Sequence, residues 1–317
     1  MILSVDMDYG SPSYAILAED SMTHAKSHDI FAETTEDIEG VVHFNEKMYF
    51  TGEDALLEDS ESVISLLTKD HLKDYAPLFL WSILKKNNLS CSDIDTLYIS
   101  ISPCDMDIYE KLRVSLENFT INGENFHFPE LYFTAQGSIA KNAINELISP
   151  PVDMALIINI GDINLSIFEV YKGKSFPVVN DSVMLEGFES EGIIKILQSL
   201  QEYVRKEYDT SITNAEAIRV LYSGNFELFG KHDLSKIINS YSQDYSRYVG
   251  KICNRFKGTE LKRIKDIFIV GSHSKYVDAE AFLSSFKVRT AKVRTLKGAT
   301  FFNATGGIIF HKNNQGD

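Results

Sequence analysis

The sequence predicts an α/β protein with two similar domains. Residues 156–168 read as a strand, a turn that contains glycine and a second strand, and they echo residues 2–17 at the start of the chain. Each copy places a short acidic or amide residue, Asp6 or Asn159, at the end of a strand. Strands and amphipathic helices alternate through both halves, which is typical of a sheet covered by helices. Two copies about half a chain apart therefore predict two domains of the same plan.

The first half begins with the opening hairpin and continues as alternating strands and helices. A second hairpin is expected at residues 41–51, followed by a short helix near residues 52–55, whose acidic side chains suit a helix N-terminus. Apolar residues at helical spacing predict a helix over residues 71–86. The remaining expected elements are strands at 95–102 and 128–134 and helices at 106–116 and 136–148.

The second half repeats this plan after consecutive prolines, Pro150 and Pro151, which interrupt helices and strands alike. The expected elements are strands at 156–159 and 165–170, a two-residue turn at 172–173, helices at 189–208, 214–222 and 234–256, a strand at 266–270 and a last helix from about residue 301. We therefore expect one domain at 1–150, with a small insertion at about 30–75, and a second at 151–300. The C-terminal helix, 301–317, is expected to pack back on the first domain.

The composition describes a globular protein without a nucleic-acid surface. The chain has 317 residues, of which 44% are hydrophobic, and this is enough for two packed cores. Its formal charge of −14 argues against a basic surface for phosphate backbones, so any link to DNA needs an adaptor protein. The chain starts in strand-like sequence and has no apolar run near 20 residues, so we expect no signal peptide and no membrane span. The three cysteines lack the spacing of a metal site or a disulfide framework, which favours a reducing cytoplasm.

The two glycine turns predict a site for an anion. A turn without a Cβ lets backbone N–H groups approach an anion closely, and a carboxylate beside the turn can hold a metal-bound water. Two such turns on similar domains imply that the domains face each other across a nucleotide cleft.

Five segments, in order along most of the chain, resemble bacterial actin-like proteins, with the plasmid-segregating ParM and StbA group as the most similar branch. The first is residues 6–13, Asp-Met-Asp-Tyr-Gly-Ser-Pro-Ser, where that group usually reads Asp-x-Gly-Tyr-Gly-Asn-x-Lys. Asp6 and Gly10 match. Asp8 replaces a glycine, and Ser13 replaces the lysine that normally reaches the β- and γ-phosphates. An ordinary acidic hairpin is the alternative interpretation of this segment.

The second and third segments also follow the order of that group. Residues 42–55 are similar to its hairpin-to-helix segment, and residues 133–140 resemble the place where actins carry a glutamine that orients the attacking water. Gln136 would take that role here, because an amide polarises water by hydrogen bonding without a shifted pKa. The alternative is that Gln136 merely opens a helix.

The fourth segment, residues 159–166, stands where the ParM group usually reads Asp-Ile-Gly-Gly-x-Thr-x-Asp. Gly161 is retained, and Asp162 sits where eukaryotic actins also carry an aspartate. Asn159 replaces the usual carboxylate. An amide can bond phosphate or water, but it brings no charge toward Mg²⁺.

The fifth segment pairs residues 268–274 with residues 302–307, which resemble the adenosine-side loop and the start of the closing helix. Gly271 is the one glycine of that loop that survives. Between the fourth and fifth segments, residues 214–219 look like the Ala-Glu-x-Ile-Lys helix motif of the MreB group, whose acid and base face the adenosine. An acid and a base three residues apart on a helix also form ordinary solvated pairs.

The resemblance implies two RNase-H-like actin-type domains around a nucleotide cleft, ATP and Mg²⁺ as ligands, self-association into filaments, and a role in plasmid or cargo segregation. It implies that Asp6 holds Mg²⁺ and serves the chemistry together with Gln136. The residues implied at the nucleotide are Gly10, Ser11, Ser13, Asn159, Gly161, Asp162 and Asn164 for the phosphates and Glu216, Arg219, Gly271 and Ser272 for the adenosine.

A different class of function is an actin-fold pseudo-ATPase scaffold or adaptor, PilM-like or FtsA-like, in pilus or cell-division machinery. The missing lysine, carboxylate and glycines all weaken nucleotide and metal binding, which favours such a scaffold. A sugar kinase of the same fold needs a catalytic base beside a sugar site, and no carboxylate-rich insertion supplies one. On the sequence alone, the scaffold therefore remains the alternative to an active filament-forming ATPase.

Overall fold

The computed structural model describes residues 1–8, 12–27, 31–56, 63–64, 69–152, 154–171, 174–177, 191–254, 263–288 and 290–314. The chain divides into two compact units. Unit 1 is Met1–Leu147 together with Phe301–Asp317, and unit 2 is Ile148–Thr300. Unit 1 is therefore assembled from both ends of the sequence, whereas unit 2 is continuous.

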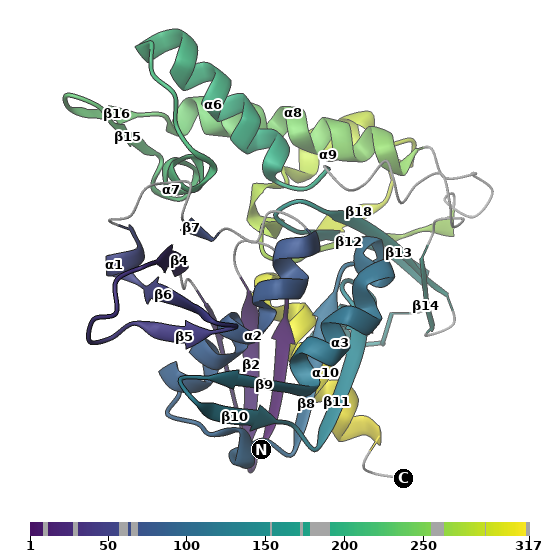
Figure 1. Cartoon of the computed structure of the whole chain (residues 1–317). Coiled ribbons are helices and arrows are strands. Elements are labelled where there is room, and N and C mark those ends of the chain that lie inside the picture. The colour runs from purple at the N-terminus through teal and green to yellow at the C-terminus, as the bar shows by residue number, and fades with distance from the viewer. Residues whose placement is uncertain are drawn as a thin grey trace. The chain divides into compact units, whose positions relative to one another are not determined.

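The core of unit 1 is a mixed five-stranded sheet in the order β11-β8-β1-β2-β3 (Figure 1). Its strands are β1 (Ile2–Asp6), β2 (Ser13–Ala18), β3 (Ser21–Lys26), β8 (Thr96–Ile101) and β11 (Glu130–Ala135). β1 runs antiparallel to β2 and parallel to β8. Every residue of β8 is buried, as expected for a strand that is covered on both faces.

The last helix of unit 1 packs with very close backbone contact. The helices of this unit are α2 (Lys69–Lys86), α3 (Tyr109–Glu117), α4 (Ala140–Leu147) and α10 (Phe302–Asn314), with 3-10 helices η1 (Cys91–Asp93) and η2 (Pro103–Ile108), and η5 (Ala299–Phe301) leads into α10. α10 contacts α4 and β1. A Cβ on Gly306 would overlap the carbonyl oxygen of Ile139, and a Cβ on Gly307 would overlap the side chain of Ser4. The two glycines therefore let α10 lie directly on β1 and on the turn before α4.

A second sheet of six strands completes unit 1, in the order β10-β9-β5-β6-β4-β7. Its strands are β4 (Phe31–Thr34), β5 (Val42–Phe44), β6 (Lys47–Thr51), β7 (Val63–Ile64), β9 (Asn118–Ile121) and β10 (Glu124–His127), and the short helix α1 (Glu53–Leu56) follows β6. The hairpin expected at 41–51 is confirmed as β5 and β6. The β9–β10 hairpin is absent from the predicted elements, although its turn, Asn122-Gly123 with φ of 52° and 77°, is a typical two-residue hairpin turn.

Unit 2 is built on a five-stranded sheet of the same plan, in the order β14-β13-β12-β17-β18. Its strands are β12 (Met154–Ile160), β13 (Leu165–Tyr171), β14 (Lys174–Pro177), β17 (Asp266–Val270) and β18 (Lys292–Arg294). β12 runs antiparallel to β13 and parallel to β17, as β1 does with β2 and β8. The prediction of two similar α/β domains is confirmed.

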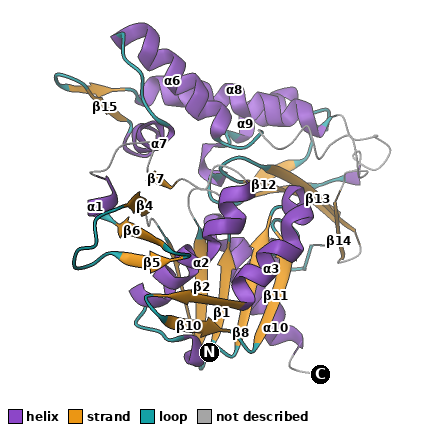
Figure 2. Cartoon of the chain, in the orientation of Figure 1, coloured by secondary structure: helices purple, strands orange, loops and turns teal. Residues whose placement is uncertain are grey.

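The helices of unit 2 gather beside a small hairpin (Figure 2). They are α6 (Ile194–Tyr208), α7 (Asn214–Ser223), α8 (Ser235–Cys253) and α9 (Ala279–Ser285), with the 3-10 helix η4 (Ser274–Tyr276). The hairpin of β15 (Asn225–Glu227) and β16 (Lys231–Asp233) directly follows α7. Within the described ranges, no helix combines the length and the apolar character that a bilayer crossing requires.

Four predicted helix boundaries are wrong. The helix expected at 136–148 begins at Ala140, because residues 136–139 form a turn in which Gly137 has a φ of 83°. The helix expected at 106–116 begins at Tyr109, after the 3-10 helix η2. The helix expected at 189–208 begins at Ile194, since residues 191–193 are not helical. The helix expected to reach residue 256 ends at Cys253. The turn at 172–173 and residues 189–190 lie outside the described residues.

Candidate functional site

Two equivalent strand ends carry the predicted site residues. In unit 1, Asp6 ends β1 and lies directly opposite Ser13 of β2. In unit 2, Asn159 lies near the end of β12 and directly opposite Ser166 of β13. All four side chains are buried. Because β1 and β12 hold the same place in their sheets, residues 6 and 159 occupy equivalent positions.

The carboxylate of Asp6 is held by two amide side chains. Gln136 Nε2 donates to Asp6 Oδ1 at 2.7 Å, and Asn303 Nδ2 donates to Asp6 Oδ2 at 3.0 Å. The backbone N–H of Gly137 donates to Asn303 Oδ1 at 2.7 Å, which fixes that amide. The structure thus brings the predicted pair, Asp6 and Gln136, into contact. Gln136 lies in the turn before α4, so the interpretation that it merely opens a helix is wrong.

The surroundings of Asp6 favour its neutral form. Burial and the nearby charge of Asp8 raise its pKa to about 8, while the amides of Asn303 and Gln136 and the ammonium of Lys26 act in the opposite direction. A buried carboxyl group with a second carboxylate beside it holds a proton at neutral pH unless a cation compensates the charge. The end of β1 is therefore a place where a cation would be strongly favoured.

Lys26 stands in the same row of the sheet as Asp6. Ser13 of β2 lies between them, because it pairs with Asp6 on one side and with Lys26 of β3 on the other. Directly opposite residues point to the same face of a sheet, and the charge of Lys26 lowers the pKa of Asp6. Lys26 was missed by sequence reasoning. The two-residue turn between Ala18 and Ser21 is the signal that sets its register.

Two buried hydroxyl groups mark both strand ends. Ser13 Oγ and Ser166 Oγ make no hydrogen bond to any described residue. Leaving a buried polar group unpaired costs about 1–3 kcal/mol, so these hydroxyls favour an oxygen-rich ligand that would bond to them. Two predicted neighbours of Ser13, Gly10 and Ser11, lie outside the described residues.

The turn after β12 is fixed by the start of α6. Gly161 N–H donates to the carbonyl of Asn164 at 3.0 Å, which closes the turn. The backbone N–H groups of residues 192, 193 and 194 donate to the carbonyls of residues 163, 161 and 162. A Cβ on Gly192 would lie 2.6 Å from the Gly161 oxygen, so the approach requires a glycine. The predicted residues Gly161, Asp162 and Asn164 therefore lie together in a preorganised turn.

A buried acid–imidazole pair joins this turn to the loop after β17. His273 Nε2 and Asp162 Oδ1 are 2.6 Å apart, and both side chains are almost fully buried. Gly271, with a φ of 94°, passes so close to residue 159 that a Cβ would lie 2.6 Å from Asn159 Oδ1. Gly271 is thereby brought next to the end of β12, and Ser272 follows it in the chain. His273 was missed, because a single histidine in a loop gives no spacing signal.

A cavity of about 740 Å³ opens in unit 2 beside this loop. Tyr222, at the end of α7, and Tyr276, in η4, contribute aromatic rings to its wall. The buried ring of His273 lies near both, with centroids 6.1 Å apart in each case and interplanar angles of 24° and 29°. The ammonium of Lys275 lies 4.7 Å and 4.8 Å from the two tyrosine centroids, and burial lowers its pKa. The cavity thus combines flat aromatic surface with one cation.

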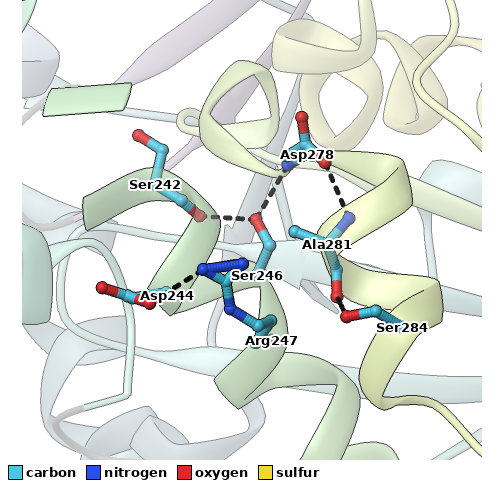
Figure 3. Close-up of polar contacts among 7 residues, drawn as sticks. All are labelled: Ser242, Asp244, Ser246, Arg247, Asp278, Ala281 and Ser284. Atoms are coloured by element: carbon cyan, nitrogen blue, oxygen red, sulfur yellow. Dashed lines mark hydrogen bonds and ion pairs between the residues drawn. The ribbon is translucent and has the colours of Figure 1, made fainter. Parts of the chain in front are cut away.

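The facing wall of the cavity is fixed by a chain of hydrogen bonds between α8 and α9 (Figure 3). Ser246 Oγ donates to the carbonyl of Ser242 at 2.6 Å and accepts from the backbone N–H of Asp278 at 2.8 Å. Asp278 in turn caps α9 by accepting from the N–H of Ala281 at 2.7 Å. These bonds fix the start of α9 against α8 on this side of the cavity.

No protein-family model and no curated protein sequence matches the chain. Solved structures match it over nearly their whole length. The archaeal actin homologue Ta0583 in complex with ADP superposes with a TM-score of 0.73 at 15% identity, covering 98% of this chain and 99% of that one. A 15-stranded ParM filament from Clostridium botulinum superposes with a TM-score of 0.71 at 17% identity, with the same coverage. The actin-like protein Alp7A gives a TM-score of 0.66 at 14% identity, covering 99% of this chain and 96% of that one.

The chain has the actin fold. The predicted fold class, two actin-type α/β domains, is confirmed. These similarities show the fold alone, so the roles of individual residues rest on the geometry above.

Glu216 and Arg219, which the resemblance places beside adenosine, both lie on α7. Glu216 closes a capping box: its carboxylate accepts from the N–H and the hydroxyl of Thr213 at 2.7 Å and 3.0 Å. Arg219 is exposed one turn further on, and no ion pair joins it to Glu216 within the described ranges. The residue of α7 that reaches the loop after β17 is Tyr222. Aromatic character at the C-terminal end of the helix was the available signal.

The donors at the end of β1 suit a hard cation. Asp6 and Asp8 are both buried and close enough for the charge of one to raise the pKa of the other. No group of three or more potential metal-ligating side chains occurs in the part of the chain that the structure describes. Two carboxylates without further protein ligands match Mg²⁺, which keeps most of its waters and completes its shell with phosphate oxygens.

Proposed function

We propose that this protein binds ATP with Mg²⁺ and assembles into filaments. The observation that carries the proposal is the buried Asp6 carboxylate, bonded to Gln136 and Asn303 beside Asp8, in a chain with the actin fold. The structures that share this fold include an ADP complex and filaments of ParM and of AlfA from a Bacillus subtilis plasmid, which support both parts of the proposal.

The phosphates and the metal would lie at the equivalent strand ends. Asp6, with Asp8, would hold Mg²⁺ through water, and the ion would supply the positive charge that the phosphates and the two carboxylates need. The hydroxyls of Ser13 and Ser166 would donate hydrogen bonds to the phosphates. Asn159, the turn at 161–164, Gly10 and Ser11 would bind the phosphates as well. Lys26 would replace the lysine that is absent at position 13, because it stands in the same row of the sheet.

The adenosine would occupy the cavity beside the loop after β17. Tyr222, Tyr276 and Lys275 offer aromatic and cationic surfaces for a flat base. Gly271 and Ser272 would border the sugar, and Glu216 and Arg219 would lie further along α7. The fixed separation of α8 and α9 would keep the cavity open before the nucleotide arrives.

Hydrolysis would depend on Gln136. The hydrogen bond from Nε2 to Asp6 fixes the orientation of the side-chain amide. The carbonyl oxygen of this amide can then accept a hydrogen bond from an attacking water. This group positions the water and needs no change of its own charge. Because the site is built from weak donors, we expect slow turnover.

The cellular role would be the movement of a plasmid or another cargo in the cytoplasm. The formal charge of −14 means that DNA would be held by an adaptor protein, and not by the filament itself.

Sedimentation of the purified chain tests the proposal. With ATP and Mg²⁺ the protein should pellet above a critical concentration and release phosphate, and with EDTA in place of Mg²⁺ it should stay in the supernatant. The control is an Asp6→Ala chain, which should neither pellet nor release phosphate. Pelleting without phosphate release would point instead to the scaffold class, and absence of ATP binding would refute the proposal.

A further inference from the structure

The tip of the β15–β16 hairpin carries a phenylalanine that contacts nothing in its own unit. Phe229 has an exposed fraction of 106%, the highest of the large hydrophobic side chains in the described residues. Its φ is 51°, in the left-handed region where a bulky side chain is strained and where turns normally use glycine or asparagine. Gly230 follows, with open space around it. Two unfavourable features, backbone strain and an exposed aromatic ring, therefore coincide at Phe229.

The hairpin below the tip is rigid. Phe226 is buried, and its ring lies 5.1 Å from Tyr208 of α6, while His232 on the facing strand lies 4.7 Å from the same tyrosine. His232 Nε2 bonds the carbonyl of Leu228 at 3.0 Å, and the N–H of Leu228 bonds the carbonyl of Gly230 at 2.9 Å. These contacts hold the backbone beneath Phe229 in place, which lowers the conformational entropy lost when the exposed ring binds at an interface.

Unit 1 contains a groove with the chemistry to receive such a ring. The α2–α3 groove, of about 390 Å³, is lined by the apolar side chains of Phe44, Pro77, Val114 and Phe119, by Lys111, and by Lys73 with Asp74, which form an ion pair at 3.3 Å. Val114 is 68% exposed, so apolar surface lies open to solvent here. In the described part of the chain, Lys111 has no ion-pair partner, and neither has Glu227, which lies two residues before Phe229.

We propose that Phe229 inserts into the α2–α3 groove of a second copy of this chain, with Glu227 set against Lys111. This contact rests on the proposed self-assembly and names the surfaces that carry it. The tip and the groove are different surfaces, so the contact is heterologous: each copy offers its tip to one neighbour and its groove to another. A contact of this kind that does not close into a ring continues as a filament.

Cysteine pairing between copies tests the contact directly. In a Cys91→Ser background, which leaves the buried Cys104 and Cys253, a Phe229→Cys chain is mixed with a Val114→Cys chain under oxidising conditions. A disulfide-linked dimer should form in the mixture with ATP and Mg²⁺, and much less in either variant alone. An Ile38→Cys chain, whose cysteine stands at another exposed position outside the groove, replaces Val114→Cys as the control.

Two further variants separate this contact from the nucleotide site. Phe229→Ala should raise the critical concentration for pelleting at least tenfold, while ATP affinity stays within twofold and the melting temperature is unchanged. Glu227→Lys and Lys111→Glu should each weaken pelleting, and the double variant should restore it. If wild-type protein pellets but the mixed Phe229→Cys and Val114→Cys chains form no cross-link, or if Phe229→Ala pellets like wild type, the contact is refuted and the filament proposal stands. If wild-type protein never pellets, both are refuted.

Discussion

The ends of β1 and β12 have the same strand pairing but carry different side chains. Both strands pair with an antiparallel neighbour, and on that neighbour a buried serine lies directly opposite the residue compared here. At the end of β1 the strand offers a carboxylate, and at the same place on β12 it offers an amide. The carboxylate is balanced by the amides of Gln136 and Asn303, whereas the amide lies against the backbone of Gly271.

This difference shows how an acid is accommodated in each unit. In unit 1 the acid sits in the strand row itself, and burial raises its pKa. In unit 2 the acid is three residues later, at Asp162, and pairs with His273. A buried acid that already has an imidazole partner has less need of a cation. We therefore expect the two strand ends to respond in opposite ways when their side chains are exchanged.

The largest effect is expected from Asp6→Asn, which gives unit 1 the amide of unit 2. Burial and Asp8 raise the pKa of Asp6 from 3.8 to about 8, so between these values the folded chain holds a proton that the unfolded chain has released. The free energy of unfolding should therefore fall as the pH rises through this window. Asp6→Asn should remove that slope and stabilise the ligand-free chain at pH 8 by on the order of a few kcal/mol.

Urea unfolding between pH 4 and pH 8 measures this slope. Asp244→Asn, which changes an exposed acid, is the matched control and should keep the wild-type slope. A wild-type free energy of unfolding that does not fall with rising pH would contradict the expected burial of a neutral carboxyl group at β1.

Lys26→Ala should weaken the binding of ATP with Mg²⁺, because it removes the cation that stands in the row of Asp6 and Ser13. The loss of one charge-assisted phosphate contact is about 1.5–3 kcal/mol, roughly a ten- to hundredfold change in affinity. Titration calorimetry measures it, with Lys26→Arg expected to retain most of the affinity. Lys85→Ala, at an exposed position of α2, is the control. Equal affinities for all these chains would show that Lys26 does not contact the phosphates.

Asn159→Asp should destabilise the ligand-free protein, because it buries a second carboxylate near Asp162 where the backbone of Gly271 leaves no room for rearrangement. We expect a loss of about 2 kcal/mol that ATP with Mg²⁺ partly restores. Thermal unfolding with and without the ligand measures both, and the exposed Asn88→Asp serves as the control. An unchanged melting temperature would mean that this strand end tolerates a buried carboxyl group without the destabilisation expected here.

The smallest effect is expected from Gln136→Ala, which should slow phosphate release about tenfold while ATP affinity stays within about twofold. Tenfold corresponds to about 1.4 kcal/mol, a modest demand on one positioned amide. Gln201→Ala removes a glutamine that bonds Asn214 in unit 2, and it should leave turnover unchanged. Wild-type turnover in the Gln136→Ala chain would exclude this residue from the chemistry.

The sequence predicts the repeated sheets because their signals are local. Alternating apolar residues, glycine turns and the break at the two prolines are each read within a few residues, and the resemblance then supplied Asp6 and Gln136. Asn303 escaped prediction because its contact with Asp6 joins residues 297 positions apart. Lys26 depends on strand register, and His273 on the packing of one loop against one turn. Contacts of these kinds are set by the tertiary fold, which no local pattern encodes.

The discontinuity of unit 1 has a consequence for synthesis. A ribosome that adds 5–20 residues per second needs roughly 15–60 s to synthesise the chain from Asp6 to Asn303. During that time the carboxylate of Asp6 lacks the hydrogen bond from the Asn303 amide. Unit 2 is continuous and is made entirely within that interval. It can therefore fold on the ribosome while the first strands are still without α10. The nascent chain cannot complete the Asp6 site before α10 emerges, so any function of that site begins only after the whole of unit 2 has been made.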